Sequence, residues 1–202
     1  CLTIFGTAIP THYYQALSER MLTNGFFARM LIIECAKRAP GQEPCILPIP
    51  ERVLRAAADW AGYRPGGAGD LAAEHPVPDT VPQTPEAGAE LVDMRLEAEA
   101  EYAKSEAGGD AVGTTVWGRV SEHVRKLALL YAVSERGAVD GPRVSREGVA
   151  WARSLVMHQT RRMLFQASSY VAMGAFDSDC LRCLDRLRKS PVRALLHRDL
   201  LR

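Results

Sequence analysis

The sequence lacks any run approaching the ~20 apolar residues that a membrane-spanning helix requires. Its longest candidates, Leu2–Phe5 and Met30–Ile33, have only the length of buried strands. The sequence also lacks an excess of charge of either sign, because its net charge is +1. We therefore expect a soluble chain with no membrane partner.

The sequence also lacks the short motifs of several enzyme classes. No G-x-x-x-x-G-K-[ST] occurs, and the glycine-rich stretch 66–69 has neither the lysine nor the flanking strand of a phosphate-binding loop. There is no G-x-S-x-G and no H-E-x-x-H, and the five histidines are scattered. We expect no metal site, no bound cofactor and no complete active site in this chain alone.

Cysteine usage argues against a disulfide framework. The five cysteines are odd in number and irregular in spacing, with no secretory signal ahead of them, so a cytoplasmic location is expected. Cys180 and Cys183 form a C-x-x-C without a second ligand pair. With the neighbouring leucines they predict an apolar helical stripe.

The residues that are present favour a mostly α-helical protein. Apolar residues make up 47% and charged residues 24% of the 202 residues, as in globular proteins. Apolar periodicity and capping residues predict helices packed as a bundle. Their expected ranges are about Glu51–Tyr63, Pro85–Ala107, Thr115–Arg136, and from an N-cap at Ser145 to about Ala172.

The N-terminal part has a different pattern. Leu2–Phe5 and Met30–Glu34 read as buried strands, joined through a helix from Thr11 to about Leu22. Such a pair is typical of the last part of an α/β sheet, since two strands alone are marginal. The chain begins inside a strand-like run and ends inside a helix-like pattern, so we expect it to be cut from a longer protein.

The C-terminal residues are basic. Residues 180–202 hold seven Arg or Lys against two Asp, a net charge of +5 that suits DNA. A helix capped by Asp177 or Ser178 and ending at Ser190-Pro191, then a second helix over Val192–Arg202, predicts the start of a helix-turn-helix or winged-helix module. A solvated helix face is the alternative. The candidate nucleic-acid contacts are Arg182, Arg186, Lys189, Arg193, Arg198 and Arg202.

Other charged or polar residues stand out by position. Thr7 follows a predicted strand, at the edge where α/β sheets bind ligands, and Arg29 opens the next strand. Arg29 is either a surface residue or a charge aimed at a phosphate. Glu97, Glu99 and Glu101 read as a solvated helix face.

Two parts of the chain resemble a known family. The segments Leu2-Thr3-Ile4-Phe5-Gly6-Thr7-Ala8-Ile9-Pro10 and Asn24-Gly25-Phe26-Phe27-Ala28-Arg29-Met30-Leu31-Ile32-Ile33 resemble the end of the ATPase domain in phage and plasmid primase/helicase-type proteins, a family long listed as of unknown function. Residues 117–128 and 144–152 look like its helical C-terminal region.

The resemblance implies a RecA-like P-loop ATPase acting on DNA in replication, as a homo-oligomeric ring. Thr7 matches the polar strand-end position that senses the terminal phosphate, and Arg29 matches the arginine of a G-F-x-x-R element, a candidate arginine finger. ATP and magnesium then bind upstream residues of the longer protein. The implied domains are 1–37 (end of the ATPase core), 38–174 (helical, with a mobile loop at 65–85) and 175–202 (start of the helix-turn-helix).

Two other functions fit the sequence. One is a helical DNA-binding or assembly module without catalysis. The other is a protein-interaction domain that docks a partner through the acidic helix at 86–106.

Overall fold

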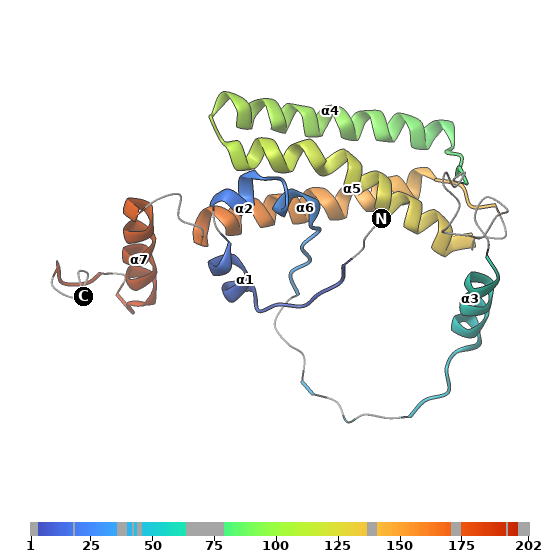
Figure 1. Ribbon diagram of the computed structural model, residues 1–202, viewed down its shortest axis with the longest axis horizontal. Helices are drawn as coiled ribbons and strands as arrows, with labels where there is room; N and C mark the ends of the chain where they lie inside the picture. Colours follow the sequence, from blue (N-terminus) through green and yellow to red (C-terminus); the bar gives the residue numbers. More distant parts are fainter. Residues whose placement is uncertain are drawn as a thin grey trace. The chain divides into compact units, whose positions relative to one another are not determined.

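The structure, a computed structural model, is mainly helical, as predicted (Figure 1). It describes residues 4–17, 19–35, 40–41, 43, 46–63, 79–136, 141–170, 175–192 and 194–197. The elements are α1 (Pro10–Ala16), α2 (Glu19–Thr23), η1 (Phe27–Arg29), α3 (Glu51–Gly62), α4 (Pro85–Ala107), α5 (Ala111–Arg136), α6 (Arg146–Tyr170) and α7 (Ala175–Lys189). None of the helices in these ranges is long and apolar enough to cross a membrane.

Side-chain caps fix the starts of the three long helices. Thr84 Oγ1 accepts from the N–H of Ala87 (3.1 Å), Asp110 Oδ1 from that of Gly113 (2.8 Å), and Ser145 Oγ from that of Gly148 (3.2 Å). Each bond satisfies a donor that the first helical turn leaves unpaired. The predicted cap at Ser145 is confirmed. The predicted start at Thr115 is four residues late, because Asp110 caps α5 at Ala111.

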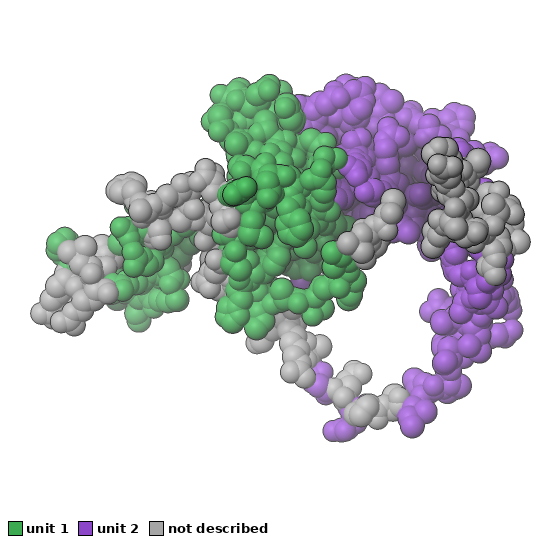
Figure 2. Space-filling view, in the orientation of Figure 1, with its two compact units in different colours: residues 1–34, 101–119, 158–202 green, residues 35–100, 120–157 purple. Residues whose placement is uncertain are grey.

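The chain divides into two compact units (Figure 2). Unit 1 consists of residues 1–34, 101–119 and 158–202, and unit 2 of residues 35–100 and 120–157. The long helices α4, α5 and α6 contribute residues to both units. The first 34 residues therefore belong to a unit that also contains parts of the helical region.

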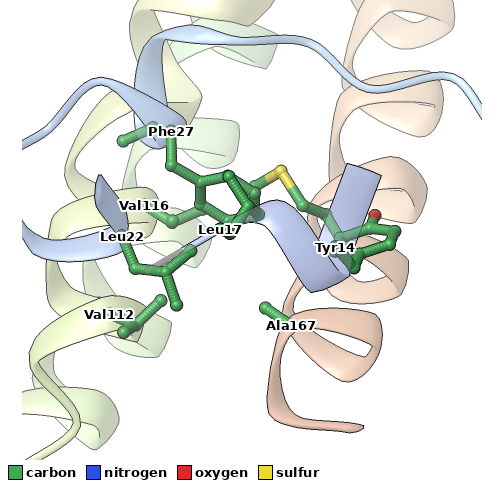
Figure 3. Packing of buried hydrophobic residues seen from close by; sticks show 9 residues of the cluster. Tyr14, Leu17, Leu22, Phe27, Val112, Val116 and Ala167 are labelled. Atoms are coloured by element: carbon green, nitrogen blue, oxygen red, sulfur yellow. The ribbon is translucent and has the colours of Figure 1, made fainter. Parts of the chain in front are cut away.

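The core of unit 1 joins the N-terminal segment to the long helices. Figure 3 shows side chains of α1, α2 and η1 gathered with those of α5 and α6. Phe27 is completely buried and Tyr14 is 1% exposed. The buried members of this cluster are Tyr14, Leu17, Leu22, Phe27, Ala28, Val112, Val116, Met163 and Ala167.

The two predicted strands are not strands in the part of the chain described. Ile4 and Phe5 are exposed in irregular backbone, and Leu2 lies outside the described residues. Met30–Glu34 begins with extended backbone at Met30 but pairs with no strand. Instead, the Tyr13 hydroxyl donates to Met30 Sδ (3.5 Å) and Ile32 packs against the core cluster. The apolar pattern at 30–34 therefore reflects packing against helices rather than a sheet.

Unit 2 is built from the other parts of the same helices. Its buried side chains are Ala87, Leu91, Met94, Ala98, Val120, Val124, Ala128, Ala132, Val144, Val149, Ala152, Val156 and Met157. A single β-bridge between Gln83 and Val144 joins the segments that lead into α4 and α6. It is the only β pairing in the described ranges. The α3 helix agrees with its predicted range and has no buried residue.

Arg153 ties α6 to α4 in unit 2. Its Nη1 donates to Glu90 Oε1 (2.6 Å), and its Nε and Nη2 donate to Glu97 Oε2 (3.2 and 2.7 Å). These hydrogen bonds, Glu97 first, raise the pKa of Arg153. The expectation that Glu97, Glu99 and Glu101 form a purely solvated face is wrong for Glu97, because Arg153 reaches it from a second helix.

The C-terminal prediction is confirmed for its first helix, although α7 begins at Ala175, before the predicted caps Asp177 and Ser178. The α7 helix ends at Lys189, and Ser190 and Pro191 form a bend and a turn, as predicted. Residues 194–196 are not helical, and the Ser190 hydroxyl donates to the Ala194 carbonyl there (2.8 Å), whereas His197 is helical. Residues 193 and 198–202 lie outside the described residues, so the rest of the predicted second helix stays a prediction. Residues 65–78 of the predicted loop 65–85 also lie outside them.

The Arg153 contact predicts a stability difference. Arg153→Ala removes three hydrogen bonds to two partly buried carboxylates, so the free energy of unfolding in urea should fall by about 2 kcal/mol. Arg95→Ala is the matched control, because Arg95 pairs with Glu99 along the exposed side of α4 (2.6 Å). That change should cost about 0.5 kcal/mol or less. Equal losses in the two variants would contradict the role given to Arg153.

Candidate functional site

The Asn24–Arg29 turn contains the G-F-x-x-R element and presents Arg29 at the surface. The N–H of Asn24 donates to the Arg20 carbonyl (3.0 Å) at the end of α2. Asn24 Oδ1 then accepts from the N–H of Phe26 (2.9 Å), which closes an Asx-turn around Gly25. Local hydrogen bonds thus set the path of the chain into η1.

Gly25 is required by the geometry of this turn. Its φ is +79°, a left-handed conformation that L side chains rarely adopt. A Cβ at Gly25 would lie 2.9 Å from Arg29 Nη1. Glycine therefore permits both the backbone conformation and the approach of the arginine.

The Arg29 guanidinium is anchored at one atom. Its Nη1 donates to the Gly25 carbonyl (2.8 Å), and the side chain is exposed. In the part of the chain that the structure describes, no carboxylate pairs with it. A guanidinium has five N–H donors in a planar fork, which suits phosphate or carboxylate oxygens. The turn therefore offers a fixed positive charge to an anion.

Burial of the two residues after Phe26 fixes the turn to the protein. Phe27 is 0% and Ala28 2% exposed, whereas Phe26 is 50% exposed. The N–H of Arg29 donates to the Phe26 carbonyl and that of Met30 to the Phe27 carbonyl (both 3.1 Å). Arg29 follows directly on two core residues, so its backbone has little freedom to move.

Thr7, the second predicted site residue, is not brought together with Arg29. It is exposed in the irregular segment before α1, and no hydrogen bond joins it to Arg29. The strand expected to place it at a sheet edge is absent among residues 4–6. Its predicted role stays a prediction.

The basic C-terminal residues are only partly described. Arg182 forms an ion pair with Asp179, and Lys189 with Asp185 (2.6 Å), while Arg186 is half-buried on the same helix. Arg193, Arg198 and Arg202 lie outside the described residues. Exposed pairs of this kind contribute little free energy, so a phosphate can replace the carboxylate. Cys180 and Cys183 are free thiols on α7.

The structure adds a contact that sequence reasoning missed. Arg162 Nε donates to Glu34 Oε2, which links α6 to the segment that follows Arg29. A signal for it exists in the sequence, because no Asp or Glu occurs between Gly148 and Phe176. The arginines of α6 must therefore find carboxylates on other segments.

No metal centre is formed by the side chains in the described ranges, where no group of three His, Cys, Asp or Glu gathers. No protein-family model, curated protein or solved structure matches this chain. The assignment of a function therefore depends on the residues themselves.

The geometry of Gly25 generates a prediction with an internal control. Gly109 also has a positive φ (+69°), but a Cβ there would meet nothing within 4 Å. Alanine at either position should lower the free energy of unfolding by about 1–2 kcal/mol. Only Gly25→Ala should also displace Arg29.

A double-mutant cycle in chemical denaturation separates the two effects. In an Arg29→Ala background the cost of Gly25→Ala should fall, while that of Gly109→Ala should not change. A cost of Gly25→Ala that is the same in both backgrounds would show that Arg29 does not rest against Gly25.

Proposed function

We propose that this chain is the C-terminal part of a DNA-dependent ATPase of primase/helicase type, in which Arg29 acts as an arginine finger. The observation that carries the proposal is the Asn24–Arg29 turn. In this turn the Gly25 carbonyl accepts a hydrogen bond from the exposed Arg29 guanidinium. Phe27 and Ala28, which directly precede Arg29, are buried in the core.

The packing of the turn supports the proposal. Phe27 and Ala28 share a core cluster with Val112 and Val116 of α5. The next residues of α5, 117–128, carry the second group of family-like residues. The Asn24–Arg29 turn is therefore packed against the part of α5 that directly precedes the second family-like segment.

The chemistry of the proposed role follows from the guanidinium. In phosphoryl transfer, negative charge develops on the oxygens of the transferred group, and a preorganised arginine stabilises that charge. Arg29 does this for ATP bound to a neighbouring subunit, so the protein works as a homo-oligomer. The residues that bind ATP and magnesium precede this chain in the longer protein. In this proposal Thr7, from this chain, contacts the terminal phosphate.

Basic residues of the C-terminal segment contribute DNA contacts in this proposal. Arg182, Arg186 and Lys189 lie on one helix, where Arg182 pairs with Asp179 and Lys189 with Asp185. Binding to single-stranded DNA should then weaken with salt, with a slope of about −0.7 for each phosphate contact.

The test is steady-state ATP hydrolysis by the longer protein, with and without single-stranded DNA. Arg29→Ala should lower the DNA-stimulated kcat by about 10³-fold or more, because the finger acts only on the transition state. Arg29→Lys should also lose most of the activity, since an ammonium cannot replace the planar fork. Arg55→Ala is the control, because Arg55 pairs with Glu51 on the exposed surface of α3 (3.1 Å).

A mixing experiment tests the action across subunits. Arg29→Ala protein and a variant defective in its own ATP-binding loop should each be inactive, and a mixture should regain activity at interfaces that combine the intact halves. Unchanged hydrolysis in Arg29→Ala would overturn the proposal. A wild-type protein that binds DNA but hydrolyses no ATP would instead support the DNA-binding or assembly module.

A further inference from the structure

Glu34 is a buried carboxylate five residues after Arg29. Only 7% of its side-chain surface is exposed. Its Oε2 accepts from Arg162 Nε, a contact across 128 positions of the sequence. A buried charge is tolerated in a protein only when it is paired, so the placement of Glu34 depends on Arg162.

Tyr14 reports the same buried environment from α1. Its ring is 1% exposed, and burial first, then the negative charge of Glu34, raises the pKa of its hydroxyl. The positive charge of Arg162 acts in the opposite direction. The carboxylate, the phenol and the guanidinium thus form one cluster between α1, α6 and the segment after η1.

Every second residue of the segment from Arg29 to Glu34 contacts a helix. Met30 accepts a hydrogen bond from the Tyr13 hydroxyl (3.5 Å), Ile32 packs on the core cluster, and Glu34 pairs with Arg162. The backbone is extended at Met30, and alternate side chains of extended backbone point to the same side. This side faces the helices. Phe27 therefore fixes the start of the segment, and the ion pair between Glu34 and Arg162 fixes its end.

We propose that Arg162 is a positioning residue for Arg29, acting through its ion pair with Glu34. The proposal rests on the proposed function, because it assigns Arg162 to the same site. Arg162 holds Glu34 and thereby the extended segment, and this keeps Arg29 in the orientation that the phosphate requires. Displacement of a catalytic group by about 1 Å can lower a rate by 10²-fold.

The first measurement uses amide hydrogen exchange in this chain and needs no activity. Arg162→Ala should speed exchange at residues 27–34 by about 10-fold or more, because the segment opens locally without the ion pair at Glu34. Arg161→Ala, a change at the neighbouring exposed arginine, should leave these amides unchanged. If Arg162→Ala impairs folding, Glu34→Gln removes the same ion pair while it keeps the side-chain volume.

The second measurement is ATP hydrolysis by the longer protein. Arg162→Ala and Glu34→Gln should lower kcat by about 10- to 100-fold and leave the KM for ATP within about twofold, since the lost geometry matters only in the transition state. Arg162→Lys, which keeps the charge, should recover part of the kcat. A purely structural role would instead lower the amount of folded protein and not split kcat from KM.

The outcomes separate the two proposals. An inert wild-type protein overturns the proposed function and the positioning role together. In an active protein that depends on Arg29, wild-type kcat in both Arg162→Ala and Glu34→Gln overturns only the positioning role. Unchanged exchange at residues 27–34 also overturns it.

Discussion

Phe27 is completely buried among side chains from four helices, and this contact determines where the Asn24–Arg29 turn lies. The turn has few residues and only local hydrogen bonds, so it cannot hold a conformation alone. Full burial of a phenylalanine side chain contributes about 2–3 kcal/mol. Because Arg29 follows two residues later, the packing of one aromatic ring fixes the charge that the proposed function needs.

Ion pairs of α6 add directional contacts within each of the two units. Arg153 reaches Glu90 and Glu97 of α4, and Arg162 reaches Glu34. Both arginines lie on a helix that has no carboxylate after Glu147, so their partners come from other segments. These pairs specify register between elements, whereas the apolar core supplies most of the stability. Long-range arginine contacts thus connect the segments that apolar burial brings together.

Most of the helices could be predicted from the sequence, because capping residues and apolar periodicity act locally. The ranges of α3 and α4 and the cap at Ser145 are examples. The strand prediction at Met30–Glu34 is wrong, since an apolar extended segment has the same pattern whether it faces a sheet or helices. Arg29 was found through a motif, but Arg162 was not. The lack of Asp and Glu on α6 after Glu147 implies a partner on another segment, but that partner lies 128 positions away and the local sequence does not identify it.

The most direct test of the packing is the free energy of unfolding of Phe27→Ala measured with Phe165→Ala beside it. Phe165 is 67% exposed on α6, so one variant removes a buried phenylalanine ring and the other an exposed one. We expect a loss of about 3–5 kcal/mol for Phe27→Ala and about 0.5 kcal/mol or less for Phe165→Ala. Similar small losses in both variants would contradict the account, because the turn would then not be anchored by Phe27.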